Sequence, residues 1–85
     1  MFAVEWHPYA IQKLLQIEFE AENPESIRTA ASYMDFNLRR MPLDMGESRD
    51  GDNRVWYSDY LGLYFRVNGE KNKVVVLNVA KAKRK

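Results

Sequence analysis

Hydrophobic and polar residues alternate along three stretches of the C-terminal half, Arg54–Asp59, Gly62–Val67 and Lys73–Ala80. These stretches are rich in Val, Tyr, Phe, Trp and Leu, which suit the half-buried surface of a β-sheet. We therefore predict three strands of one antiparallel sheet. Asn68-Gly69 lies between the last two stretches. Because both residues tolerate a positive φ, this pair predicts a hairpin that joins the second and third strands.

The alternation of the second predicted strand gives the sheet two chemically different faces. Leu63 and Phe65 fall on one face. Tyr64 and Arg66 fall on the opposite face. We expect helices to bury the first face and the second face to remain available to a ligand or partner. Functional residues are therefore expected around Arg54, Tyr64, Arg66 and the basic end of the last strand.

The N-terminal half predicts one strand and two helices. Phe2–Trp6 alternates between apolar and other residues, which is the pattern of a short strand with one buried face. Apolar residues then recur at helical spacing over Pro8–Glu22, and Asn23 is placed to cap a second amphipathic helix over Pro24–Met41. Because the link between the helices is so short, we expect an antiparallel helical hairpin.

The segment Pro42–Asn53 is rich in turn-forming residues and has no clear period. Asp50-Gly51 can close a small hairpin, which would add a short strand near Glu47–Arg49. Glu47 has the chemistry of a general base and Arg49 that of a phosphate-binding group. In a loop of this composition both are more often plain surface charges.

The order of elements is strand, helix, helix and then three or four antiparallel strands. This order predicts an α+β domain, with an antiparallel sheet and the helical hairpin on one of its faces. A chain of 85 residues has room for one domain only, so we assign residues 1–85 to a single unit.

The net charge of +1 conceals two halves of opposite sign. Residues 1–50 carry five Lys and Arg against nine Asp and Glu, a balance of −4, whereas residues 51–85 carry eight against three, a balance of +5. The C-terminal cations are Lys81, Lys83, Arg84 and Lys85. Such a basic end suits a surface that meets phosphates or an acidic partner peptide, and a solvated tail without a ligand is the alternative.

Composition also excludes several kinds of chemistry. The chain has no cysteine and one histidine, which rules out disulfides and thiolates and argues against a structural zinc site. His7 precedes Pro8, so we interpret it as a helix cap rather than a catalytic group. We expect no cofactor and no metal. Because the chain lacks an apolar run of about 18 to 20 residues and a signal-peptide pattern, we expect a soluble cytoplasmic protein without a membrane association.

The ordered set of apolar positions resembles a known family. It comprises Phe2-x-Val4-x-Trp6, Ala10-x3-Leu14, Pro42-x3-Gly46, Gly62-Leu63-Tyr64-Phe65-x-Val67 and Val75-x-Leu77-x-Val79. Together with the predicted element order, this set is similar to the RelE/ParE superfamily of toxins from bacterial type II toxin–antitoxin modules. The resemblance spans nearly the whole chain, and it rests on the ordered set because no single motif is highly specific.

The resemblance implies a cytoplasmic growth inhibitor that a cognate antitoxin holds inactive. RelE-like members cut mRNA in the ribosomal A site, whereas ParE-like members poison DNA gyrase. The RelE-like reaction is an in-line attack of a ribose 2′-hydroxyl on the adjacent phosphate. It needs no metal if basic side chains position the phosphate and stabilise its developing charge.

The resemblance also suggests roles for individual residues. Arg54 or Arg66 would bind the scissile phosphate. Lys81 or Lys83 would offset charge in the transition state, and an aromatic side chain could stack on a base. The candidate nucleic-acid contacts are Arg49, Tyr57, Tyr64, Arg84 and Lys85. The antitoxin is expected to lay an extended or helical segment on the helix pair and the sheet edge, with acidic residues facing the basic half.

Two departures keep the mechanism open. RelE-like nucleases commonly carry an arginine two residues before the position matching Tyr64, and Gly62 stands there in this chain. Those nucleases also often place a tyrosine or histidine beyond the last strand, whereas this sequence ends in basic residues. Three hypotheses therefore remain: a ribosome-dependent mRNA endoribonuclease, a gyrase inhibitor without nuclease activity, and a degenerate toxin that acts only as a binding module.

Overall fold

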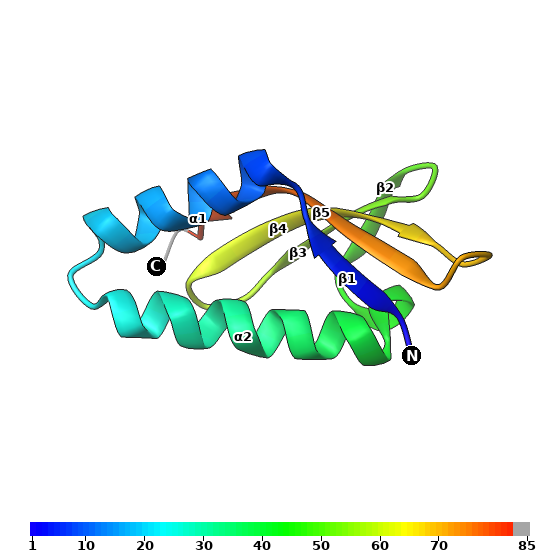
Figure 1. Ribbon diagram of the computed structural model, residues 1–85, viewed down its shortest axis with the longest axis horizontal. Helices are drawn as coiled ribbons and strands as arrows, with labels where there is room; N and C mark the ends of the chain where they lie inside the picture. Colours follow the sequence, from blue (N-terminus) through cyan, green and yellow to red (C-terminus); the bar gives the residue numbers. More distant parts are fainter. Residues whose placement is uncertain (83–85) are drawn as a thin grey trace.

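Two helices, one short 3-10 helix and five strands make up the described part of the chain, residues 1–82, in this computed structural model (Figure 1). In chain order they are β1 (Ala3–Trp6), α1 (Pro8–Glu20), α2 (Pro24–Arg40), η1 (Pro42–Asp44), β2 (Glu47–Asp50), β3 (Asn53–Tyr57), β4 (Leu61–Asn68) and β5 (Lys73–Lys81). The predicted α+β class is confirmed. The extra strand near Glu47–Arg49 is present as β2.

The five strands form one sheet in the order β1-β5-β4-β3-β2. The four C-terminal strands pair with one another in antiparallel fashion, as predicted. The N-terminal strand differs, because β1 lies parallel to β5 with Val4 opposite Val74, so the complete sheet is mixed. The alternation of a single strand predicts which residues it buries, but it carries no information about the direction of the neighbouring strand.

The hairpin turns agree with the predicted pairings, but one of them has a different construction. Gly51 has a φ of 58° and turns β2 into β3, as Asp50-Gly51 predicts. The predicted β4–β5 pairing is also present. Its connection is longer than a two-residue turn, and the positive φ, 50°, belongs to Asn72. Asn68 starts this turn by accepting a hydrogen bond from the Lys71 N–H through Oδ1 (3.1 Å).

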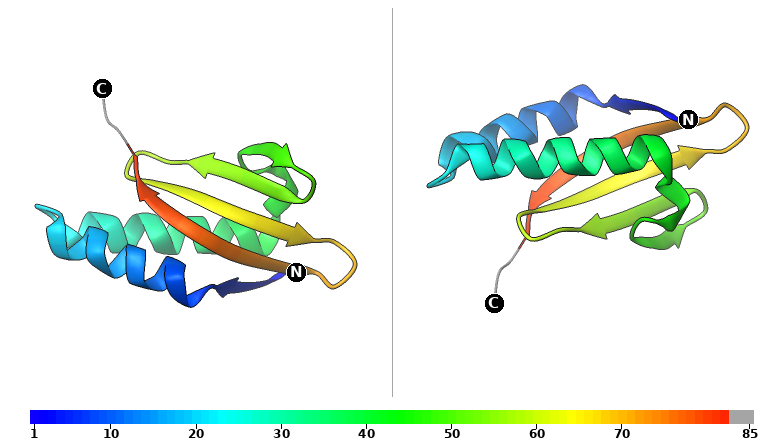
Figure 2. Two further views of the ribbon diagram at one scale, coloured as in Figure 1. Left: turned by 90° about the horizontal axis from the view of Figure 1, so that it is seen from above. Right: turned by 90° about the horizontal axis from the view of Figure 1, so that it is seen from below.

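Both helices lie on the same side of the sheet, which gives the protein two layers (Figure 2). The core fills the space between the layers. Its sheet residues are Leu61, Leu63, Phe65, Val67, Val74, Val76 and Val79, and its helix residues are Ala10, Ile27, Ala30, Ala31, Met34 and Leu38. Burial of each larger aliphatic or aromatic side chain stabilises the fold by about 1.5–3 kcal/mol. Helix α2 supplies most of the helical part of this core, whereas α1 is buried only at Ala10.

The ends of the helices are fixed by local hydrogen bonds. His7 Nδ1 accepts a hydrogen bond from the Tyr9 N–H (3.1 Å), so the predicted cap of the first helix is confirmed. Asn23 occupies the cap position of α2 but makes no side-chain capping bond.

Asp35 joins α2 to β1, because its carboxylate accepts hydrogen bonds from Trp6 Nε1 (2.9 Å) and Arg39 Nε (2.7 Å). Neither helix within residues 1–82 has the length and apolar character needed to cross a membrane.

Candidate functional site

The face of the sheet that points away from the helices is termed the open face. Along β4, Leu63 and Phe65 are buried toward the helices, whereas Tyr64 is half-buried and Arg66 is exposed. The cross-strand pairs place Tyr57 opposite Gly62 and therefore on the same face as Tyr64. The central residues of the open face are Asn53, Val55, Tyr57, Gly62, Tyr64, Arg66, Asn78 and Ala80. The predicted division of the sheet into two faces is present.

Tyr57 lies against the backbone of Gly62 on the open face. A Cβ atom added to Gly62 would clash with Cδ1 and Cε1 of the Tyr57 ring, and its three nearest atoms would all belong to that ring. The tyrosine nevertheless remains 62% exposed. The exposed Tyr57 ring therefore packs directly over Gly62, which has no side chain.

Two shallow hollows border the Tyr57 ring. One, with a volume of about 350 Å³, is lined by Val55, Tyr57, Gly62, Leu63, Tyr64, Asn78, Val79 and Ala80. The other, of about 400 Å³, is lined by Tyr57, Ser58, Ala80, Lys81 and Ala82. Tyr57 lines both hollows, so a mainly apolar depression and a hollow with Lys81 in its lining share this residue.

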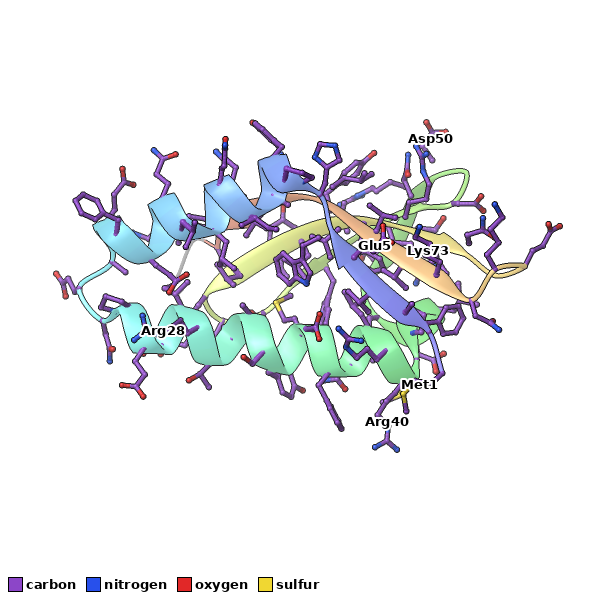
Figure 3. The ribbon with its side chains drawn as sticks, viewed as in Figure 1. Met1, Glu5, Arg28, Arg40, Asp50 and Lys73 are labelled. Atoms are coloured by element: carbon purple, nitrogen blue, oxygen red, sulfur yellow. The ribbon has the colours of Figure 1, made fainter. Side chains whose placement is uncertain are left out.

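Exposed cations lie on or beside the sheet toward the end remote from Tyr57, each with a weak partner. Arg66 Nε donates a hydrogen bond to Asn53 Oδ1 (3.0 Å). On the edge strand, Arg49 lies 3.7 Å from a carboxylate oxygen of Glu47. Toward the opposite edge, Lys73 Nζ lies 3.0 Å from Glu5 Oε1 (Figure 3). Exposed pairs of this kind contribute only about 0–1 kcal/mol, so an anionic ligand can compete for the cations at little cost.

Arg54 does not belong to the open face, which corrects the expectation that it acts beside Tyr64 and Arg66. It stands opposite Phe65 in the sheet and therefore points to the helix side. Its Nε donates to the Met45 carbonyl (3.1 Å) and its Nη2 to the Gly46 carbonyl (3.2 Å). Arg54 thus holds the turn that precedes β2. Pairing Tyr57 with Gly62 in the sequence would have predicted this orientation.

The structure brings Tyr57, Tyr64 and Arg66 together on the open face, with Arg49 at its β2 edge. Lys81 ends β5 and lines a hollow that Tyr57 also lines, but it stands opposite Leu61 and so belongs to the helix side by register, like Arg54. The remaining predicted site residues, Lys83, Arg84 and Lys85, lie outside the described residues. Sequence reasoning noted Gly62 only as a departure from a family pattern, and it did not select Asn78 at all.

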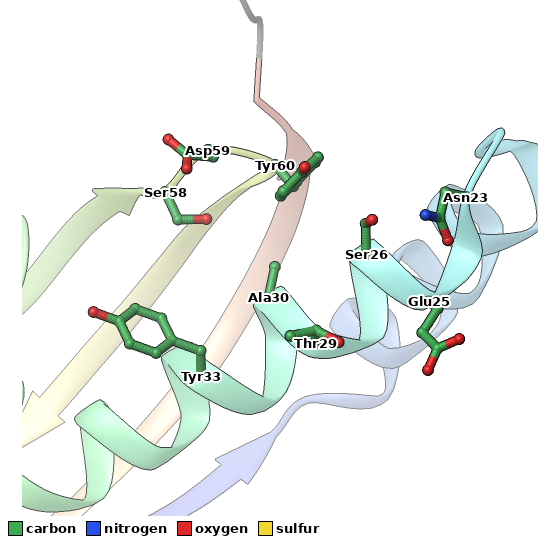
Figure 4. Close-up of a pocket in the computed structure, with 9 residues that line it drawn as sticks. All are labelled: Asn23, Glu25, Ser26, Thr29, Ala30, Tyr33, Ser58, Asp59 and Tyr60. Carbon is green, nitrogen blue, oxygen red and sulfur yellow. The ribbon is translucent and has the colours of Figure 1, made fainter.

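A larger hollow of about 530 Å³ lies away from the open face, between α2 and the loop that joins β3 to β4 (Figure 4). Its lining consists of Asn23, Glu25, Ser26, Thr29, Ala30, Tyr33, Ser58, Asp59 and Tyr60. None of the residues predicted for the site is among them. Across residues 1–82, no group of three or more His, Asp or Glu side chains is arranged to hold a metal ion.

Comparison with known proteins identifies the fold. No protein-family model and no curated protein matches the sequence. A chain of the toxin–antitoxin complex RelBE2 from Mycobacterium tuberculosis superposes with a TM-score of 0.77 at 20% identity, covering 95% of this chain and 98% of that one. A chain of the chromosomal ParDE TA system from P. aeruginosa gives 0.72 at 18% identity and covers 98% of both chains.

The isolated E. coli RelE toxin is also similar, with a TM-score of 0.73 at 16% identity, covering 100% of this chain and 88% of that chain. These identities are too low to transfer an activity, but the superpositions extend over nearly the whole length of each chain. The resemblance noted in the sequence is therefore confirmed at the level of structure: this protein has the fold of the RelE/ParE toxins.

Proposed function

We propose that this protein is the toxin of a type II toxin–antitoxin module and that it inhibits growth as a ribosome-dependent mRNA endoribonuclease. The observation that carries the proposal is the gathering of Tyr57, Tyr64 and Arg66 on the open face of a sheet with the RelE/ParE fold. Aromatic rings and cations are the groups with which proteins bind single-stranded RNA. The helix side of the sheet, by contrast, is filled by the core.

The proposed reaction is an in-line displacement at a phosphodiester. The ribose 2′-hydroxyl loses its proton and its oxygen bonds to phosphorus, while the bond to the 5′-oxygen breaks and that oxygen takes up a proton. Arg66 binds the scissile phosphate after exchanging its hydrogen bond to Asn53 for one to a phosphate oxygen. Lys81, the cation predicted to offset the charge of the transition state, stands opposite Leu61 at the other end of β4 and on the helix side, so it is not placed to act on the same phosphate.

Gyrase inhibition is the second candidate, and a specific observation favours it. The position that commonly carries an arginine in RelE-like nucleases is Gly62, and the Tyr57 ring occupies the space that a side chain would need there. Arg54 cannot substitute, because it faces the helix side and is bound to two carbonyl groups. A toxin that acts without cleaving RNA would not require an arginine at this point.

A cognate antitoxin is the proposed partner, since the similar RelBE2 and RelBE chains come from toxin–antitoxin complexes. Helix α1 offers an apolar surface to it. Ile11, Leu15 and Phe19 follow one another at intervals of one helical turn and are 44%, 58% and 90% exposed. An amphipathic or extended segment of the antitoxin would cover this row and bury its apolar surface.

The basic C-terminal half gives a test of antitoxin binding. Reversing Lys81 and Lys83 together to glutamate should abolish or strongly weaken the complex, because acidic antitoxin residues would then meet like charges. Calorimetric titration with the antitoxin encoded beside this protein provides the measurement. An unchanged affinity would show that the basic end takes no part in the interface.

Controlled expression in bacteria, followed by primer extension on total mRNA, tests the proposed activity. Growth arrest with cuts phased to codons inside translated messages is the expected result. Arrest with intact mRNA would reject the nuclease and favour the gyrase-directed alternative, which a DNA-break assay would then examine. Unimpaired growth would reject a toxin function altogether.

A further inference from the structure

Tyr57 is the most exposed aromatic side chain of the sheet, and its setting suggests a defined ligand. We propose that Tyr57, seated on Gly62, is a stacking platform for one unpaired base of single-stranded RNA. Asn78 would lie at the edge of that base. The inference rests on the proposed function in one respect, that the open face meets RNA, and it adds the substrate group and the residues that receive it.

The contact with Gly62 determines how the ring is presented. Because the ring lies over a residue without a side chain, it can rest on the sheet backbone while 62% of the tyrosine remains exposed. A stacking platform needs an aromatic ring that is held in position and still accessible to a base. Any other residue at position 62 would displace the ring, so Gly62 acts as a positioning residue.

The Tyr57 ring does not pack in the hydrophobic core. Trp56 and Tyr60, its neighbours along the chain, both pack against the hydrophobic core, and Tyr57 does not. Trp56 also lies near another aromatic ring on the helix side, with 6.2 Å between its centroid and that of Tyr33. The Tyr57 side chain therefore contributes little to the stability of the fold. An exposed aromatic residue of this kind is well suited to bind a ligand.

The first hollow beside Tyr57 supplies a polar group for the edge of a base. Asn78 lines the first hollow, and its Oδ1 accepts a hydrogen bond from the Val79 N–H (2.8 Å), so its Nδ2 hydrogens can donate to an acceptor on a base. An aromatic face from β3 and an edge donor from β5 thus adjoin one another on the open face.

An NMR titration of the labelled protein tests the platform. The probes are hexauridylate and hexaadenylate, and a duplex of the same length is the control. We expect amide shifts around Tyr57 and Gly62 with the single strands and much smaller shifts with the duplex, because paired bases cannot stack on the ring. Tyr57→Leu should weaken binding roughly tenfold, whereas Tyr57→Phe should bind almost like the original protein.

Two further variants separate the platform from a general effect. Gly62→Ala keeps the tyrosine but displaces its ring, so it should weaken binding about as much as Tyr57→Leu, roughly tenfold. Its amide spectrum also verifies the fold. Tyr33→Leu is the matched control, since Tyr33 is 59% exposed but lies on the helix side. It should leave the affinity unchanged.

The outcomes distinguish this inference from the proposed function. Binding that is unaffected by Tyr57→Leu, or shifts centred outside β3 and β4, would overturn the platform. The absence of any shift with single-stranded RNA would overturn it as well. In each of these cases the primer-extension assay still decides independently whether the protein cleaves mRNA.

Discussion

The two faces of the sheet are built from alternate residues of the same strands, yet they serve different purposes. On the helix side, Leu63 and Phe65 are completely buried and hold the two layers together. On the open face, Tyr64 and Arg66 occupy the intervening positions and remain at least partly accessible. The comparison teaches that stability is concentrated on one face, so the other is free to carry chemistry that the fold does not need.

Two arginines make the same comparison at the level of single residues. Arg54 and Arg66 lie on adjacent strands but on opposite faces. Arg54 donates to two backbone carbonyls and fixes a turn, whereas Arg66 donates to one side chain, that of Asn53. Identical side chains are therefore structural on the helix side and available to a ligand on the open face.

The largest expected effect comes from breaking the buried face. Phe65→Ala should lower the free energy of unfolding by about 3–5 kcal/mol, because it leaves a cavity at a fully buried position. Urea denaturation followed by circular dichroism measures the loss. Tyr64→Ala, one residue away on the open face, is the matched control and should lose clearly less. Equal losses would contradict the division between the faces.

An intermediate effect is expected from Arg54→Ala. The variant loses two hydrogen bonds from a charged donor to carbonyl groups, and we expect stability to fall by about 1–3 kcal/mol. Lysine can make only part of these hydrogen bonds. The stability of Arg54→Lys should therefore lie between that of the original protein and that of Arg54→Ala. The same denaturation assay applies. If Arg54→Ala abolishes RNA binding while stability is unchanged, Arg54 is a ligand-binding residue and its structural assignment is wrong.

The smallest effect on stability is expected from Arg66→Ala, which should change it by no more than about 0.5 kcal/mol. Within residues 1–82, its side chain makes one hydrogen bond, to the half-buried Asn53. Thermal unfolding provides the measurement. A large drop in the melting temperature would mean that Arg66 supports the fold, and its loss of function could then not be interpreted.

The sequence predicted the elements and the two faces because both depend on local pattern. Leu63 and Phe65 alternate with Tyr64 and Arg66 within one strand, so their separation needs no knowledge of the neighbouring strands. The His7 cap was predicted for the same reason, since it depends on the Pro8 that follows it. The alternation along β4 and the cap at His7 are both present in the folded protein because the tertiary contacts favour the same local structure.

The orientation of Arg54 and the contact between Tyr57 and Gly62 depend instead on the register of β3 against β4. The loop Ser58–Tyr60 sets that register, and a slip of one residue would exchange the faces of every side chain on β3. The parallel pairing of β1 with β5 is similarly a property of the whole chain path. The first two features depend on how two consecutive strands pair, and the third joins distant segments, so the alternation within one strand encodes none of them.

The central claim is that the open face acts on RNA. Primer extension on mRNA from cells that express the original protein, Arg66→Ala or Arg28→Ala tests it most directly. Arg28 is a matched exposed arginine on α2, paired with Glu18 at 3.2 Å and remote from the open face. We predict codon-phased cuts with the original protein and Arg28→Ala, and their loss with Arg66→Ala at equal protein levels. Undiminished cuts with Arg66→Ala, or no cuts with the original protein, would contradict the claim.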